Sequence, residues 1–195
     1  MPKEVDRDAR LAEIAEATIQ IVRTLGSKAV TIRSVARQLG GSTALVTNYL
    51  PSRSALILNV LDRVNARWIE EYERKSPKLE PLERFFELLS WRSHPDDSEV
   101  VFRALIFEII TNAESEPALL DKLQRESRIY REVLVAAATD AGFIFPLRAA
   151  DIGYLLLRGQ YFANAENPDY WRPELMREIT VSMLSGLSRK PRDDS

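Results

Sequence analysis

Hydrophobic residues recur along the chain at intervals of three and four positions, the spacing of one face of an α-helix. Near the N-terminus this pattern predicts an amphipathic helix that ends at Gly26 and two short helices capped by Thr31 and Ser42. A longer helix follows Ser52 and runs out near Pro77. Because no segment alternates between apolar and polar residues as a strand does, the pattern predicts an all-α protein.

Beyond Pro77 the predicted helices become longer. They are placed at roughly 80–92, 98–114, 117–141, 148–165 and 172–188. Two segments within them, Val100–Ile110 and Ile152–Ala163, are apolar nearly all round, which predicts burial in a core, a cavity wall or a subunit interface. The expected organisation is a three-helix head over 7–53, a connecting helix over 54–75, a helical body over 76–188 and a flexible tail over 189–195.

The composition excludes several kinds of chemistry. The 195 residues contain no cysteine and a single histidine, His94, which excludes disulfides, thiolate chemistry and metal sites that need two imidazoles. The seven glycines form no phosphate-binding loop. We therefore expect neither a metal nor a cofactor. No apolar run reaches 18 residues and the N-terminal residues are charged, so we expect a cytoplasmic protein that makes no contact with a membrane.

The charges are unevenly distributed along the chain. Between Ala17 and Leu61 there is no acidic residue, although about seven would be expected there at the chain-wide frequency. The same segment contains five cations, which are Arg23, Lys28, Arg33, Arg37 and Arg53. A basic surface without carboxylates suits a polyanion, because each carboxylate would repel phosphate. Charge alone leaves open a surface that binds an acidic protein.

The segment from Thr31 to Tyr49 has the pattern of a helix-turn-helix. A small residue, Ala36, stands where a second helix must cross closely, and Gly40 follows where a sharp turn favours a positive φ. The second helix offers short polar side chains that fit a major groove, while hydroxyls and cations around it suit phosphates. The residues expected to contact DNA are Lys28, Thr31, Arg33, Ser42, Thr43, Leu45, Thr47, Asn48, Tyr49 and Arg53. The alternative is an ordinary helical hairpin within a bundle.

The stretches TIRSVARQLGGS (31–42) and VTNYLPSR (46–53), with Leu56, resemble the DNA-binding head of the tetracycline-repressor (TetR) family of bacterial regulators. The resemblance covers about a quarter of the chain. It implies a nine-helix, Ω-shaped homodimer that binds a palindromic operator, and a divergent effector domain whose last two helices form a four-helix dimer bundle. Three positions depart from the family's usual residues: Gly41 replaces a branched apolar residue, Thr47 a tyrosine and Arg53 a lysine.

The resemblance also implies that a small effector binds in the C-terminal body and releases the operator. Candidate wall residues at helical spacings are Trp91, Phe102, Ile106, Glu108, Ile110, Tyr130, Leu134, Tyr154, Arg158 and Phe162, although such stripes are also typical of plain core. Glu108 and Arg158 lie in the two most apolar segments, where they could pair with each other, anchor a ligand or reach solvent. An apolar pocket with such anchors suits a mostly apolar effector with a polar end.

The last predicted helix has small residues on one face, which would let a partner helix approach closely. The candidate dimer interface comprises Leu175, Ile179, Ser182, Met183 and Gly186, with packing inside one subunit as the alternative.

Two other functions are possible on the sequence. Ser93, His94, Asp96 and Asp97 are the one nucleophile-base-acid cluster that can be proposed, but neighbours within one loop rarely converge as a triad, so we do not expect an enzyme. The main alternative to a regulator, most simply a repressor, is a helical interaction module that binds an acidic partner without reading DNA sequence.

Overall fold

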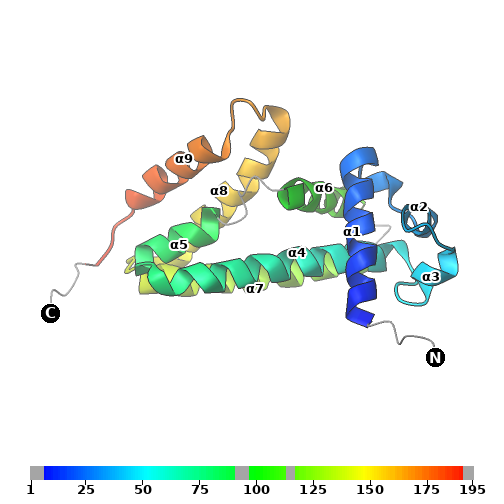
Figure 1. The fold of residues 1–195 in the computed structure, drawn as a ribbon. Helices are drawn as coiled ribbons and strands as arrows, with labels where there is room; N and C mark the ends of the chain where they lie inside the picture. The colour runs from blue at the N-terminus through cyan, green and yellow to red at the C-terminus, as the bar shows by residue number, and fades with distance from the viewer. Residues whose placement is uncertain (1–6, 91–96, 113–116, 191–195) are drawn as a thin grey trace. The chain divides into compact units, whose positions relative to one another are not determined.

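The computed structural model describes residues 7–90, 97–112 and 117–190, and within these ranges the chain is helical. Figure 1 shows the helices in order: α1 (Arg7–Leu25), α2 (Ile32–Gln38), α3 (Thr43–Thr47), α4 (Arg53–Lys75), α5 (Pro81–Ser90), α6 (Asp97–Thr111), α7 (Pro117–Asp140), α8 (Pro146–Glu166) and α9 (Pro173–Ser185). Short 3-10 turns follow α1 and α4, and the described ranges contain no strand beyond one isolated bridge. The all-α prediction is confirmed. No described helix is long and apolar enough to cross a membrane.

The chain forms two compact units that alternate along the sequence. The first contains residues 1–67 and 96–123, and the second contains residues 68–95 and 124–195. The head therefore shares its unit with α6, which packs against α1 and the turn Ser27–Ala29. The expected functional division at residue 53 remains a prediction, because compactness alone does not test it.

The core of the first unit joins the head to the start of α4. Leu56, Ile57 and Val60 of α4 are fully buried, and Phe102 and Leu105 of α6 are buried in the same unit. Ser52 caps α4, since its hydroxyl accepts a hydrogen bond from the Ala55 amide at 3.1 Å. The apolar stripes predicted from the sequence thus supply this core.

The second unit is built from α5, α8, α9 and the adjoining parts of α4 and α7. Phe85 of α5 packs against Phe143 with ring centroids 5.2 Å apart. Gly153 lets α8 approach α5 closely, because a Cβ there would lie 2.9 Å from a methyl carbon of Leu89. Leu157 is buried in the same core. The face of α8 that contains Gly153 and Leu157 is therefore fixed inside this unit.

Candidate nucleic-acid interface and ligand site

The turn between α2 and α3 is set by Gly40. Its φ is +67°, in the left-handed region that favours glycine, and the Gly41 amide donates to the Ala36 carbonyl at 2.9 Å. This pairing closes the C-terminus of α2, so the chain leaves the helix in a defined direction. The sequence predicted this turn at the correct residue.

Two local features hold the hairpin together. At the start of α2, Thr31 and Ser34 form a reciprocal capping box, with hydroxyl-to-amide distances of 3.0 and 2.9 Å. Between the helices, Ala36 and Val46 are buried in mutual packing of α2 and α3. Ser42 stands at the N-cap of α3 as predicted, but its side chain makes no capping hydrogen bond. The hairpin is thus held together by the capping box at the start of α2 and by the buried residues between the two helices.

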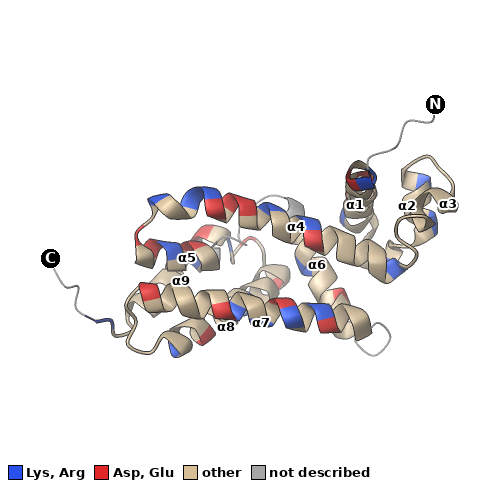
Figure 2. Ribbon diagram, turned by 90° about the horizontal axis from the view of Figure 1, so that it is seen from below, with Lys and Arg blue, Asp and Glu red and all other residues tan. Residues whose placement is uncertain are grey.

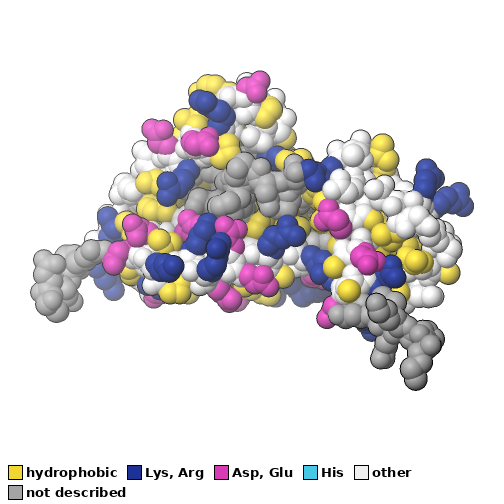
Figure 3. All heavy atoms as spheres, viewed as in Figure 1, with side chains coloured by type: hydrophobic (Ala, Val, Ile, Leu, Met, Phe, Trp, Pro, Cys, Tyr) yellow, Lys and Arg dark blue, Asp and Glu magenta, His cyan; other side chains and the backbone are white. Residues whose placement is uncertain are grey.

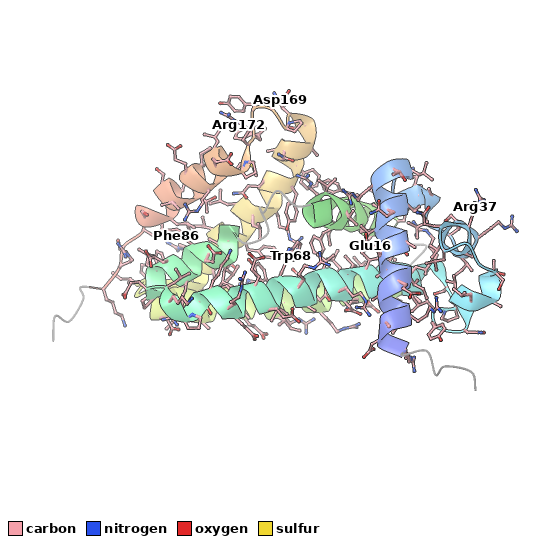
Figure 4. The ribbon with its side chains drawn as sticks, viewed as in Figure 1. Glu16, Arg37, Trp68, Phe86, Asp169 and Arg172 are labelled. Atoms are coloured by element: carbon pink, nitrogen blue, oxygen red, sulfur yellow. The ribbon has the colours of Figure 1, made fainter. Side chains whose placement is uncertain are left out.

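The outward face of this hairpin is polar and without acidic residues. Thr43 and Thr47 of α3 and Asn48, which follows it, are exposed, and Leu45 and Tyr49 are half-buried. Lys28, Thr31, Arg33, Ser42 and Arg37 are exposed around them. Figure 2 shows basic but no acidic residues on α2 and no charged residue on α3. Figure 3 shows basic side chains projecting at this edge of the head, and Figure 4 shows Arg37 extending from α2 into solvent. We call the exposed residues of 28–49 the head surface.

Arg53 does not project from the head surface. Its Nε donates to the Val30 carbonyl at 3.1 Å, and its Nη2 donates to the Ser27 carbonyl at 3.3 Å and to Glu108 Oε1 at 2.8 Å. The second carboxylate oxygen of Glu108 accepts from the Ser27 hydroxyl at 3.2 Å. The guanidinium is thus held inside the first unit. This geometry does not support the expected phosphate clamp at Arg53.

Glu108 is therefore a structural partner of Arg53 and not of Arg158. Glu108 lies in α6. Its side chain is 10% exposed, and the Arg53 side chain that it contacts is 25% exposed. Nothing in the local pattern of α6 signals this pairing, because the cation lies 55 positions away. Ser27, which completes the arrangement, was not singled out by the sequence.

The candidate effector residues divide between the two units. In the first unit, Phe102 and Ile106 are buried, Glu108 is paired as above, and Ile110 is 52% exposed. In the second unit, Tyr130 and Leu134 are buried, Tyr154 and Arg158 are half-buried, and Phe162 is 58% exposed. Trp91 lies outside the described residues, as do Ser93, His94 and Asp96, and the side chain of Asp97 is not described.

Arg158 lies within a group of polar and aromatic side chains. Its Nε donates to the Tyr154 hydroxyl at 3.0 Å, and that hydroxyl also forms a hydrogen bond with Ser127 of α7. Its guanidinium carbon lies 5.1 Å from the centroid of the Tyr154 ring and 5.6 Å from that of the Tyr161 ring. Such distances are typical of cation–π contacts. The sequence did not single out Tyr161 or Ser127, although Tyr161 follows Arg158 by three positions and so shares its helix face.

A mostly apolar groove of about 420 Å³ lies between α8 and α9. Its lining includes Leu155, Gly159 and Trp171, together with Ile179 from the candidate dimer face. Leu155 on α8 and Met183 on α9 are 68% and 55% exposed, which leaves apolar surface uncovered beside the groove. The remaining candidates Leu175, Ser182 and Gly186 range from half-buried to exposed. Trp171 and Leu155 were missed by the sequence reasoning.

Comparisons with solved structures identify the fold. A TetR transcription regulator from Haloarcula marismortui aligns with a TM-score of 0.80 at 19% identity, over 92% of this chain and 98% of that one. A transcriptional regulator from Saccharomonospora viridis, solved with choline, aligns with a TM-score of 0.80 at 16% identity, over 94% and 100%. The chain has the fold of the TetR regulators. The resemblance to the TetR family, first noted in the residues of the head, is thus confirmed for the fold.

A third structure, of a fatty acid metabolism regulator from Clostridium perfringens, aligns with a TM-score of 0.67 at 17% identity, over 91% and 100% of the two chains. No protein-family model and no curated protein matches the chain. At identities of 16–19% the fold is shared while most side chains differ, so the binding sites of those proteins do not carry over to this chain.

Proposed function

We propose that the protein is a ligand-responsive transcriptional regulator that binds a palindromic operator as a homodimer and is released from it by a small effector. The observation that carries the proposal is the α2–turn–α3 hairpin, with its polar outward face on a segment without acidic residues, in a chain with the TetR fold. In this arrangement α3 enters a major groove, and the exposed cations of the head surface contact phosphates.

The residues of the head surface have two kinds of role. Thr43 and Asn48 are the side chains on or next to α3 that suit base edges, because their short polar groups can donate and accept. Arg33 and Lys28 suit phosphates, since they are exposed cations outside the hairpin's packing. Two heads that read a palindrome must lie about 34 Å apart, one turn of DNA, or a multiple of it. Effector binding that disfavours this spacing would lower operator affinity.

The apolar surface of α8 and α9 supplies the dimer contact in this proposal. The groove between these helices and the exposed Leu155 and Met183 form an apolar area of the kind that a second copy covers. Leu155→Glu should therefore convert a dimer to a monomer in sedimentation, whereas Leu147→Glu, at an exposed site near the start of the same helix, should leave the dimer intact. A monomeric wild type would contradict this part of the proposal.

The direct test is selection of DNA from a random pool at about 150 mM salt. An enriched near-palindrome supports the proposal, and Asn48→Ala should then change discrimination among sites, by about 1–3 kcal/mol at one base pair. Arg33→Met should weaken binding to all sites alike and reduce the slope of log Kd against log salt by about 0.9. Arg177→Met, an exposed cation on α9, is the matched control.

Failure to enrich any sequence with folded, dimeric protein would contradict the operator model once bound ligand has been removed by unfolding and refolding. In that case the acid-free head would better suit an acidic protein partner, the alternative function.

A further inference from the structure

The guanidinium of Arg158 is half-buried, and the described residues supply no counter-charge for it. The group that contains it, defined here as the Arg158 cluster, comprises Ser127, Tyr130, Tyr154, Arg158 and Tyr161. The Nη1 of Arg158 and the hydroxyl of Tyr161 are both buried, and neither has a hydrogen-bond partner in the part of the chain that the structure describes. No described carboxylate forms an ion pair with Arg158.

Buried polar groups without partners lower the stability of the fold unless a ligand supplies the missing hydrogen bonds. A buried donor without an acceptor loses its hydrogen bonds to water and gains none, and a buried charge without a partner costs more. The other hydroxyls of the cluster have partners: Tyr130 donates to the Leu88 carbonyl at 2.6 Å, and the Tyr154 hydroxyl forms hydrogen bonds with both Ser127 and Arg158. The cluster therefore presents two buried polar groups, Arg158 Nη1 and the Tyr161 hydroxyl, for which the described residues supply no partner.

We propose that the Arg158 cluster binds the carboxylate of a small effector whose remaining part is apolar or aromatic. This inference rests on the proposed function, since it names the chemical class of the ligand that the regulator senses. Arg158 supplies a guanidinium Nη1–H and Tyr161 a hydroxyl, both of which donate to an anion. The Tyr154 ring, 5.1 Å from the guanidinium carbon, and the Tyr130 ring, 6.4 Å from that of Tyr154, would contact the ligand's apolar part.

The charge selects among possible ligands. One guanidinium balances one negative charge, so a monocarboxylate fits, whereas a phosphomonoester would bring in further charge that nothing described in the cluster neutralises. A quaternary ammonium such as the choline bound to the Saccharomonospora viridis regulator would meet a like charge here. The cluster therefore favours acids over cations and over neutral analogues.

The test measures ligand binding by the full-length protein without DNA. Decanoate and phenylacetate are titrated by calorimetry beside decanol and phenylacetamide, which match their shapes without the charge. We expect at least one acid to bind about tenfold or more tightly than its neutral counterpart. Arg158→Met should remove that preference, and Tyr161→Phe should weaken the acid several-fold. Arg148→Met, at an exposed position on the same helix, should change neither.

Thermal unfolding without ligand separates a binding role from a structural one. If Arg158 binds an anion, Arg158→Met should melt at or above the wild-type temperature without ligand, because a buried donor that lacks an acceptor is removed. If the cluster is structural, the variant should melt lower. Equal binding of acids and neutral analogues, or an acid preference that survives Arg158→Met, would overturn the inference. If Arg158→Met does not fold, Tyr161→Phe is measured in its place, because it retains the aromatic ring and removes only the hydroxyl.

The two proposals fail in different experiments. A protein that selects no DNA sequence but binds acids through Arg158 would refute the regulator and leave the ligand class standing. A protein that selects a palindrome but shows no preference for acids would support the regulator and refute the ligand class.

Discussion

The Arg53–Glu108 ion pair gives the sharpest quantitative prediction. Glu108→Gln keeps the shape of the side chain and removes the charge that faces Arg53 at 2.8 Å. Breaking a fully buried pair costs about 3–5 kcal/mol, and an exposed pair contributes about 0–1 kcal/mol. Because the two side chains are 25% and 10% exposed, we expect a loss of about 2 kcal/mol in the free energy of unfolding.

The assay is urea unfolding followed by circular dichroism, arranged as a double-mutant cycle with Arg53→Met. The coupling energy between the two changes should be about 1.5–2 kcal/mol, because each single variant leaves one charged partner behind. Asp62→Asn is the matched control: Asp62 pairs with Lys122 at 2.6 Å in the same unit, but the Asp62 side chain is 59% exposed. That change should cost less than about 1 kcal/mol.

DNA binding provides an independent readout of the same pair. If Glu108 holds Arg53 inside the first unit, Arg53→Met lowers stability but leaves the slope of log Kd against log salt unchanged. A coupling energy below about 0.5 kcal/mol, together with a slope reduced by about 0.9, would show that Arg53 contacts phosphate and would refute the reasoning.

Three further predictions concern local features. Gly40→Ala should lower the free energy of unfolding by about 1 kcal/mol in urea, because its φ of +67° disfavours a side chain although nothing lies within 4 Å of the new Cβ. Thr31→Ala removes the capping box of α2 and should cost about 1 kcal/mol by the same measurement, with Ser34→Ala affecting the same box. The hydrogen bond from Arg131 lowers the pKa of Asp151, so this pair stabilises the fold above the carboxyl's unfolded pKa and its contribution is lost as pH falls through the lowered value. In Asp151→Asn the free energy of unfolding, measured in urea at several pH values, should therefore fall slightly less steeply on acidification. The change should be small, as is usual for an exposed pair.

Local features of the head could be predicted from the sequence because their causes are local. Thr31 caps the helix that follows it, and Gly40 takes the positive φ that the turn needs, both within one or two turns of chain. The helix-turn-helix is thus specified by neighbours, and the structure confirms both features. Its contacts with DNA stay predictions.

Partners distant in sequence could not be predicted. Ile110 and Phe162 lie in segments that are apolar nearly all round, and such segments do not reveal which side faces the core; both residues are largely exposed. Glu108 was correctly singled out as an anomaly in an apolar helix, but its partner, Arg53, could only be found once α6 was placed beside the head. Periodicity identifies helices, whereas tertiary packing decides what each face meets.

Glu108 and Arg158 are both charged residues in apolar helices, but only Glu108 has a partner of opposite charge among the described residues. Both would be expensive alone, and the first unit compensates Glu108 fully, since each carboxylate oxygen accepts a hydrogen bond. Arg158 keeps a buried donor, and Tyr161 on the same helix a buried hydroxyl, for which the described residues supply no partner. Because ordinary core positions are more stable without such a group, its presence is better explained by a ligand that supplies the missing acceptor than by stability. In our proposal, the guanidinium of Arg158 is therefore the group that binds the effector's carboxylate.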